Sequence, residues 1–207
     1  MKFWDKLLNN IKFEKKHVLF SLIIVILGII TGAFFIVILN ESDKSIVIEY
    51  ISNFIDNIKN NNLTNINIFK NTILTNYITI LLIVIIGFTF FFFFINIFIL
   101  FYKSFILGFT ISSFILTYGI KGAVFSLVYI FPHLIINLLI YMLIVSFTIR
   151  ISIKMINYII KKKEVNMRIY FNKYFSLILI SSIIILFTTL YETYLIPHII
   201  KFIVNFI

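Results

Sequence analysis

Four long runs of apolar residues constrain the possible fold of this chain more than any other feature. The first run, 18–39, contains no Asp, Glu, Lys or Arg, and equally uncharged runs follow at 77–102, 122–149 and 175–190. An α-helix rises about 1.5 Å per residue and the hydrocarbon core of a bilayer is about 30 Å thick, so about 20 such residues can cross it. The sequence therefore predicts a membrane protein built from helices.

Composition limits what else the chain can contain. Hydrophobic residues make up 61% of its 207 residues and charged residues only 13%, so little room remains for a separate soluble catalytic domain. Cysteine is absent, which excludes disulfides, thiolate metal sites and Cys nucleophiles. The first run follows a basic stretch, as in a signal peptide, but it is too long and lacks a small-residue cleavage site. We interpret it as a retained span.

Basic residues form two patches that flank predicted spans, although the formal net charge of +10 could also suggest a nucleic acid partner. The members of the two patches are Lys2, Lys6, Lys12, Lys15, Lys16, Arg150, Lys154, Lys161, Lys162, Lys163, Arg168 and Lys173. The positive-inside rule places both patches in the cytoplasm and explains them better than nucleic acid does. We expect them to attract anionic lipid headgroups, at about 1 kcal/mol per basic residue near the surface.

We predict an all-α polytopic membrane bundle, a single domain over 1–207, with its N-terminus in the cytoplasm and its C-terminus outside. The predicted spans are 18–39, 77–101, 104–120, 122–149 and 175–196, with an outer loop at 40–76 and a basic cytoplasmic loop at 150–174. Segment 104–118 is short for a crossing, so a re-entrant hairpin is the alternative. A crossing is favoured because it lets the next span end inside, at the basic patch.

Apolar residues recur at helical spacing in the outer loop. They are Val47, Ile51, Phe54, Ile55 and Ile58, with acidic residues and Asn between them. This pattern predicts an amphipathic helix over 47–58 that lies on the outer membrane surface or against the bundle. A second amphipathic segment, 197–207, is expected at the outer interface.

Gly28 and Gly32 lie three residues apart in the first span, a spacing that lets two helix backbones approach closely in lipid. Packing within the bundle is favoured over a dimer face, because small residues are enriched at any membrane helix interface. A homo-oligomer remains a possible state.

Pro132, His133 and Asn137 are polar or helix-breaking positions inside the fourth span. Polar groups at this depth need partners. They could form a ligand or proton-relay site, or they could make interhelical hydrogen bonds beside a proline kink. We favour the packing interpretation, since the sequence shows no second histidine or carboxylate nearby to complete a metal or acid–base set.

Glu192 is an acidic residue at the outer end of the fifth span, between Tyr191 and Tyr194. It could pair with Lys121, which the topology also places outside, or it could be an exposed interfacial carboxylate. No Ser/His/Asp arrangement, zinc signature, phosphate-binding loop or pair of catalytic carboxylates can be assembled. We therefore expect no catalytic residues, no metal and no cofactor.

Several short motifs occur in an order that resembles one known family. They are Lys103, Ser104 and the Gly-Phe-Thr sequence that begins at Gly108, the Gly-x-Lys-Gly link at 119–122, the Phe-Pro step at 131–132, and Glu192, Tyr194, Leu195 and Pro197 near the end. Together they resemble the stage II sporulation protein M family of endospore-forming Firmicutes. The wider superfamily follows its Pro-His pair with Gly and, four residues after the His, Glu; here Leu134 and Asn137 stand at those positions.

This resemblance implies a non-enzymatic, multi-pass membrane protein of the sporulation septum. Its implied partners are the stage II sporulation proteins P and D, two peptidoglycan-degrading enzymes, with which it would drive septal wall thinning and engulfment. We expect partner contacts at Phe54, Ile55, Lys121, Glu192 and Tyr194. The alternative is a permease subunit, which would need an ATPase bound at 150–173 or an ion-coupling carboxylate. An intramembrane hydrolase using His133 has less support, because no nucleophile and base lie in register.

Overall fold

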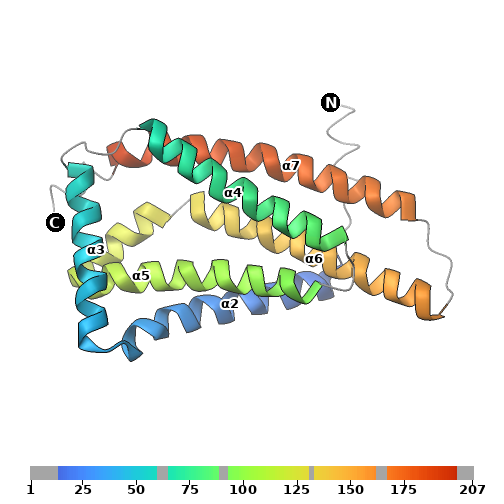
Figure 1. Cartoon of the computed structure of the whole chain (residues 1–207), viewed down its shortest axis with the longest axis horizontal. Coiled ribbons are helices and arrows are strands. Elements are labelled where there is room, and N and C mark those ends of the chain that lie inside the picture. The colour runs from blue at the N-terminus through green and yellow to red at the C-terminus, as the bar shows by residue number, and fades with distance from the viewer. Residues whose placement is uncertain (1–13, 60–64, 89–92, 131–132, 162–166, 200–207) are drawn as a thin grey trace.

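The computed structural model shows a bundle of long helices (Figure 1) and describes residues 14–59, 65–88, 93–130, 133–161 and 167–199. These residues form α2 (Lys15–Ile38), α3 (Glu41–Lys59), α4 (Asn65–Phe88), α5 (Phe93–Ile130), α6 (His133–Lys161) and α7 (Met167–Tyr194). Five helical stretches, in all but α3, are long and apolar enough to cross a membrane. The prediction of an all-α, five-span, multi-pass membrane protein is confirmed.

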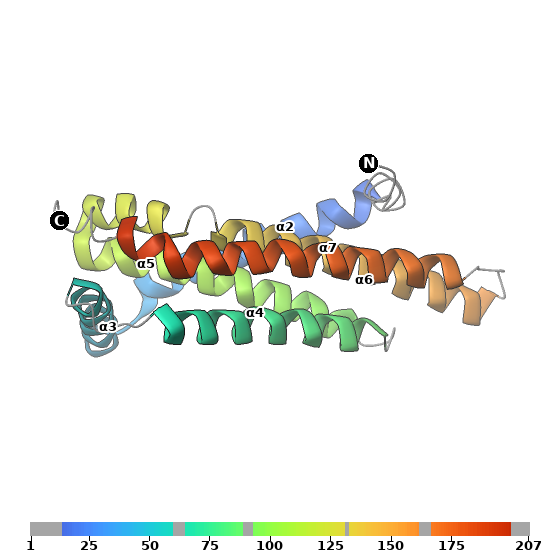
Figure 2. The ribbon, with the colours of Figure 1, turned by 90° about the horizontal axis from the view of Figure 1, so that it is seen from above.

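One helix lies across the direction of the others. α3 runs across one end of the bundle, whereas α2, α4, α5, α6 and α7 run along it (Figures 1 and 2). α2 ends and α4 begins at the end that α3 covers, and α7 ends there as well. We call this the α3 end. The predicted amphipathic helix is confirmed, because α3 packs its apolar face on α5 through Ile51 and Ile55, which are buried.

The boundary between the second and third spans differs from the prediction. Segment 77–101 is not one helix, because α4 ends at Phe88 and α5 begins at Phe93. Lys103 suggested the end of a span, yet it lies ten residues after Phe93, about 15 Å along the helix. A lysine inside a span is tolerated where it faces a polar cavity within the bundle. Segment 104–118 is therefore the second half of a long helix.

The two predicted loops also differ, because polar residues there continue the helices. α4 begins at Asn65, inside the predicted outer loop, and α6 extends to Lys161, inside the predicted basic loop. Membrane helices extend past the hydrocarbon where water can solvate their polar side chains, so the change from apolar to polar residues does not mark the helix end. The predicted tail helix lies largely at 200–207, outside the described residues.

α5 reverses direction at Gly119. This residue has φ 61° and ψ −135°, a conformation that glycine adopts without the steric cost of a Cβ. The returning segment, 120–130, packs closely on the helix before it. A Cβ placed on Gly122 would lie 1.9 Å from the carbonyl oxygen of Phe114. The fourth crossing therefore consists of two helical pieces, 120–130 and α6. Pro132, which was predicted to kink it, lies outside the described residues.

The glycines of α2 pack against α5 of the same chain. Cβ atoms added to Gly28 and Gly32 would lie 2.6 Å from Ser104 Cβ and 2.1 Å from the Phe105 carbonyl oxygen. On the α5 side, a Cβ on Gly108 would lie 2.1 Å from the Ile29 carbonyl oxygen. The two backbones are therefore in direct contact, which maximises van der Waals packing in lipid. This glycine face is occupied inside the monomer and does not serve as a dimer face.

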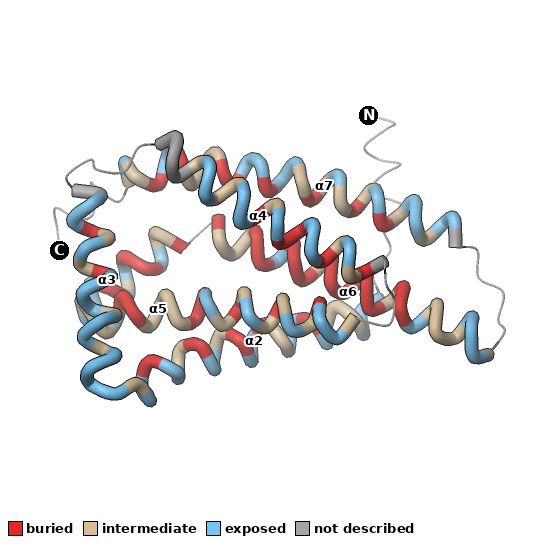
Figure 3. Tube along the Cα trace, viewed as in Figure 1, coloured by how far each residue is buried: buried red, intermediate tan, exposed pale blue. Residues whose placement is uncertain are grey.

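α6 is the central helix of the bundle. Buried residues make up 67% of its most apolar stretch, against 22–33% in the other four spans, and Figure 3 shows the concentration of buried positions along it. The residues that α6 buries include Ile144, Val145 and Phe147. The remaining helices surround it and present apolar side chains outward, as lipid-facing helices do.

Two basic residues that were predicted to attract lipid headgroups are engaged inside the protein. Arg150 Nε of α6 lies 2.8 Å from Glu14 Oε1, just before α2, and Lys154 Nζ lies 3.9 Å from the same oxygen. Lys154 also donates a hydrogen bond to the hydroxyl of Tyr170 in α7. These contacts join three helices at the end opposite α3.

Replacing Gly32 by Ala should destabilise the bundle by about 1–3 kcal/mol, because the added methyl meets a backbone carbonyl that cannot move without separating α2 from α5. Unfolding in mixed SDS and detergent micelles, followed by circular dichroism, measures this change. Val37→Ile is the matched control, since it adds one carbon to an exposed position of the same helix. Equal losses in the two variants would contradict the assigned interface.

Replacing Glu14 by Gln should lower the free energy of unfolding by about 1 kcal/mol, because Arg150 loses the charge of its partner. The control is Glu41→Gln. Glu41 also pairs with a lysine, at 3.1 Å, but its side chain is 92% exposed, so a change below about 0.5 kcal/mol is expected. The same unfolding measurement applies, and a larger effect at Glu41 would refute the role given to Glu14.

Candidate functional site

A network of hydrogen bonds links α4, α6 and α7 in the half of the bundle nearer α3. Tyr141 of α6 donates through its hydroxyl to Asn76 Oδ1 of α4, at 3.1 Å. Asn76 Nδ2 in turn lies 3.5 Å from Thr189 Oγ1 of α7. All three residues are buried. In a region without water, such bonds satisfy polar groups and hold the three helices together.

Asn137 lies one turn before Tyr141 in α6 and adds another interhelical hydrogen bond to this network. Thr188 Oγ1 donates to Asn137 Oδ1 at 2.6 Å, and Asn137 is only 2% exposed. This is an interhelical bond of the kind that the packing interpretation predicts. The amide nitrogen of Asn137, however, has no hydrogen-bond partner among the described residues. A buried donor without a partner is costly, so this nitrogen marks a place where a further group could bind.

His133 and Glu192 face each other next to the network. His133 Nε2 lies 3.8 Å from Glu192 Oε2, and Thr72 of α4 donates to the other carboxylate oxygen at 3.2 Å. The side chain of His133 is fully buried and that of Glu192 is 15% exposed. Neither His133 nitrogen nor Glu192 Oε2 has a hydrogen-bond partner in the described part of the chain.

The prediction that no carboxylate lies near His133 is therefore wrong. The two residues are far apart in sequence, but α6 begins and α7 ends at the same end of the bundle. Antiparallel neighbouring spans bring the start of one beside the end of the next, and this pairing could have been anticipated from the predicted topology.

Lys121 is not the ion-pair partner of Glu192. Among the described residues, the ionisable group within 4.0 Å of this carboxylate is His133. Lys121 follows the reversal at Gly119 and is exposed. The prediction paired two residues because both lie at the outer end, but the reversal of α5 keeps Lys121 on the surface. Tyr194, two residues after Glu192, is 54% exposed.

A cavity of about 560 Å³ adjoins the network between α4 and α5. We call it the α4/α5 crevice. Its charged lining residues are Lys103 and Glu192, and the rest of its lining includes Asn76, Asn137 and Tyr141. The sequence predicted Lys103 as a motif residue and as an intramembrane polar or packing residue, together with Gly108. Its place on the wall of this cavity could not be predicted, because it depends on where α5 begins.

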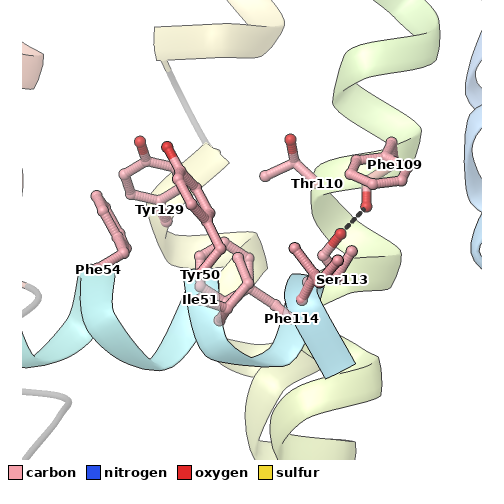
Figure 4. Close-up of a pocket in the computed structure, with 10 residues that line it drawn as sticks. Tyr50, Ile51, Phe54, Phe109, Thr110, Ser113, Phe114 and Tyr129 are labelled. Atoms are coloured by element: carbon pink, nitrogen blue, oxygen red, sulfur yellow. Dashed lines mark hydrogen bonds between the residues drawn. The ribbon is translucent and has the colours of Figure 1, made fainter. Parts of the chain in front are cut away.

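A second, more apolar cavity of about 460 Å³ lies between α3 and α5. Figure 4 shows Tyr50 and Phe54 of α3 facing Tyr129 of α5 across it. Tyr50, Thr110 and Tyr129 line this cavity as well as the α4/α5 crevice, so the two adjoin.

Phe54 and Ile55 are packing residues, which corrects their predicted role in partner binding. Ile55 is 2% exposed, and the Phe54 ring lies 5.6 Å from that of Tyr129 and 6.4 Å from that of Phe114, between centroids. The apolar face of an amphipathic helix turns towards the largest apolar surface available, here α5. Three other apolar residues of α3 are exposed, namely Ile46, Ile48 and Tyr50, at 63%, 39% and 72%. Ile46 and Tyr50 line the cavity between α3 and α5, and Ile48 lies on the opposite side of the helix from them.

The polar and charged side chains of this site can bind a further group through hydrogen bonds and charge. No group of three or more His, Cys, Asp or Glu residues that could hold a metal ion occurs among the described residues. Among the described residues, the hydroxyl hydrogen-bonded to the His133–Glu192 pair is that of Thr72, which donates to the carboxylate.

Replacing Thr188 by Val should destabilise the bundle by about 0.6–1.7 kcal/mol, because Asn137 Oδ1 loses its interhelical donor. Thr193→Val is the matched control. Thr193 is also buried in α7, but its hydroxyl bonds only to the carbonyl of Thr189 in its own helix. Unfolding in SDS and detergent micelles compares the two, and equal stability of both variants would argue against the network.

The sequence matches the family profile described as stage II sporulation protein M over residues 21–197. No curated protein and no solved structure matches the chain significantly. The matched range contains α3, the His133–Glu192 pair and all the residues that line the α4/α5 crevice. The chain therefore belongs to the stage II sporulation protein M family.

Proposed function

We propose that the protein is a non-enzymatic membrane scaffold that recruits peptidoglycan hydrolases for septal wall thinning and forespore engulfment. The family identifies a sporulation-related membrane protein. The observation that supports a scaffold is α3, a helix laid across one end of the bundle with one face packed on α5 and the other exposed. A docking partner needs such an accessible face on a fixed support.

The charge distribution supports placing the α3 end outside the cell. Six of the residues of α3 are charged, and four of these are acidic, namely Glu41, Asp43, Glu49 and Asp56. The opposite end carries Lys15, Lys16, Arg150, Lys154 and Lys161. By the positive-inside rule this opposite end would face the cytoplasm, so α3 would face the wall.

The mechanism in this proposal is positional. A hydrolase bound to α3 stays within a short distance of the adjacent peptidoglycan, which raises its effective concentration there. The proposed partners are enzymes resembling stage II sporulation proteins P and D. Their proposed contacts are Ile48 and its exposed neighbours on α3, together with Lys121 and Tyr194, which are exposed as well.

A permease subunit is the second candidate, and the α4/α5 crevice is the observation that favours it. Lys103 and Glu192 place one charge of each sign on the wall of a cavity inside the spans. A transporter of this size would need an ATPase partner or ion coupling. Partner identification therefore separates the two candidates.

Replacing Ile48 by Asp should reduce co-purification of wall hydrolases about tenfold, because an exposed apolar contact of the proposed docking surface is lost. The tagged full-length protein is purified from detergent-solubilised membranes of its sporulating host, and its partners are quantified by mass spectrometry. Ile160→Asp is the control, since Ile160 is 73% exposed at the opposite end of the bundle.

Retention of the hydrolases by Ile48→Asp, or equal loss in both variants at normal membrane levels, would argue against docking on α3. Recovery of an ATPase without any wall enzyme would favour the permease.

A further inference from the structure

We infer that the α4/α5 crevice binds the headgroup of a phospholipid that carries both a phosphate and a primary ammonium, as phosphatidylethanolamine does. Lys103 would bind the phosphate and Glu192 the ammonium. This inference concerns a different surface from the exposed face of α3 and does not depend on the scaffold proposal.

The crevice opens towards lipid. Its mouth carries the exposed residues Tyr50, Asn71, Thr75 and Ile106, from α3, α4 and α5. α4 and α5 are both spans, so an opening between them faces the bilayer. A molecule that enters from that side is a membrane lipid or another amphiphile, rather than a solute dissolved in water.

The wall of the crevice is amphipathic, as a lipid requires. Ile106, Leu107, Leu134 and Leu138 provide apolar surface for the start of an acyl chain. Polar side chains, namely Thr72, Asn76, Asn137 and Tyr141, lie on the same wall. The volume of about 560 Å³ accommodates a headgroup with its glycerol.

The charged and polar groups of the wall have unused hydrogen-bonding capacity. Lys103 is half-buried inside a span, and no carboxylate lies within 4.0 Å of its Nζ in the described ranges. Glu192 Oε2 and Asn137 Nδ2 are buried and have no hydrogen-bond partner there. A charge inside a span is costly unless it is paired. A ligand that supplies the missing partners would remove this cost.

One cation and one anion on the same wall favour a zwitterion over a purely anionic lipid. The phosphate of an anionic lipid could use Lys103, but the carboxylate of Glu192, whose ionisable neighbour within 4.0 Å among the described residues is His133, would repel that ligand. A primary ammonium provides three donors, which suits Glu192 Oε2 and the oxygens near it. The amide nitrogen of Asn137 can donate to a phosphate or ester oxygen.

The two charges lie at different depths along the bundle. Glu192 lies in the last turn of α7, at the α3 end, whereas Lys103 lies deeper, near the middle of the helix 93–118. A headgroup that enters the crevice with its ammonium towards the α3 end has its phosphate on the side of Lys103. The long stem of Lys103 lets its ammonium extend towards the interface to meet the phosphate.

The test is lipid binding to the purified full-length chain in detergent, measured by native mass spectrometry. The chain is titrated with phosphatidylethanolamine or phosphatidylglycerol of identical acyl chains. We expect the ethanolamine lipid to bind about tenfold more tightly. Lys103→Gln should weaken binding of both lipids about tenfold, and Glu192→Gln should remove the preference between them.

Two further variants separate a site from general lipid association. Lys121→Gln removes an exposed lysine outside the crevice and should change neither affinity. Thr75→Trp places a large side chain at the exposed mouth and should weaken ethanolamine lipid binding about tenfold. Thr75 is exposed, so we expect the Thr75→Trp chain to fold. Its lipid binding therefore tests the crevice even if Lys103→Gln does not fold.

Equal affinity of the unmodified chain for the two lipids, or tighter binding of phosphatidylglycerol, would overturn the assignment of Glu192 to an ammonium. Binding unchanged by Thr75→Trp would show that the lipid associates only with the outer surface of the bundle. The two proposals are tested by different measurements. An α3 variant that loses hydrolase capture but still binds lipid would support the scaffold and would not contradict lipid binding in the crevice.

Discussion

The need to satisfy polar groups inside the hydrocarbon region organises this protein around α6. Water is absent there, so a buried hydroxyl bonds to the backbone of its own helix or to a neighbouring helix, and a buried amide side chain needs partners on its neighbours. Asn137 and Tyr141 of α6 have theirs on α7 and α4. At the other end of the same helix, Arg150 reaches Glu14 beside α2. One central helix thus links three others through polar contacts, and the apolar faces of the outer helices remain for lipid.

Direct backbone contact holds α2 against α5. α2 and α5 meet through Gly28, Gly32 and Gly108, where any larger residue would overlap a backbone carbonyl. Association of helices in lipid lacks the hydrophobic driving force of water, so close packing must provide it. Of these two helices, α5 has a long first part, 93–118, that supports α3 at one end and carries Lys103 near its middle.

The broken fourth crossing creates the site. The chain reverses at Gly119, returns along 120–130 and continues in α6 from His133. This arrangement brings His133 and Glu192 together below α3. It also leaves a crevice beside them with charges of both signs. The same end of the bundle thus presents an exposed helix face and, beneath it, a cavity with charges of both signs.

The sequence by itself determined that the chain is an all-α membrane protein with five spans and an amphipathic helix after the first span, because run length and periodicity depend on local residue order. The family, too, could be recognised from the order of its short motifs. The tertiary structure decided which face of α3 is free, where α5 begins and which group pairs with Glu192. Ile55 turned out to be buried and Phe54 partly buried, and Lys103 lies ten residues inside α5 and not at the end of a span, because each of these positions depends on a neighbouring helix. Hydropathy records how apolar a residue is, but the partner that a polar group finds in lipid is set by packing between helices distant in sequence.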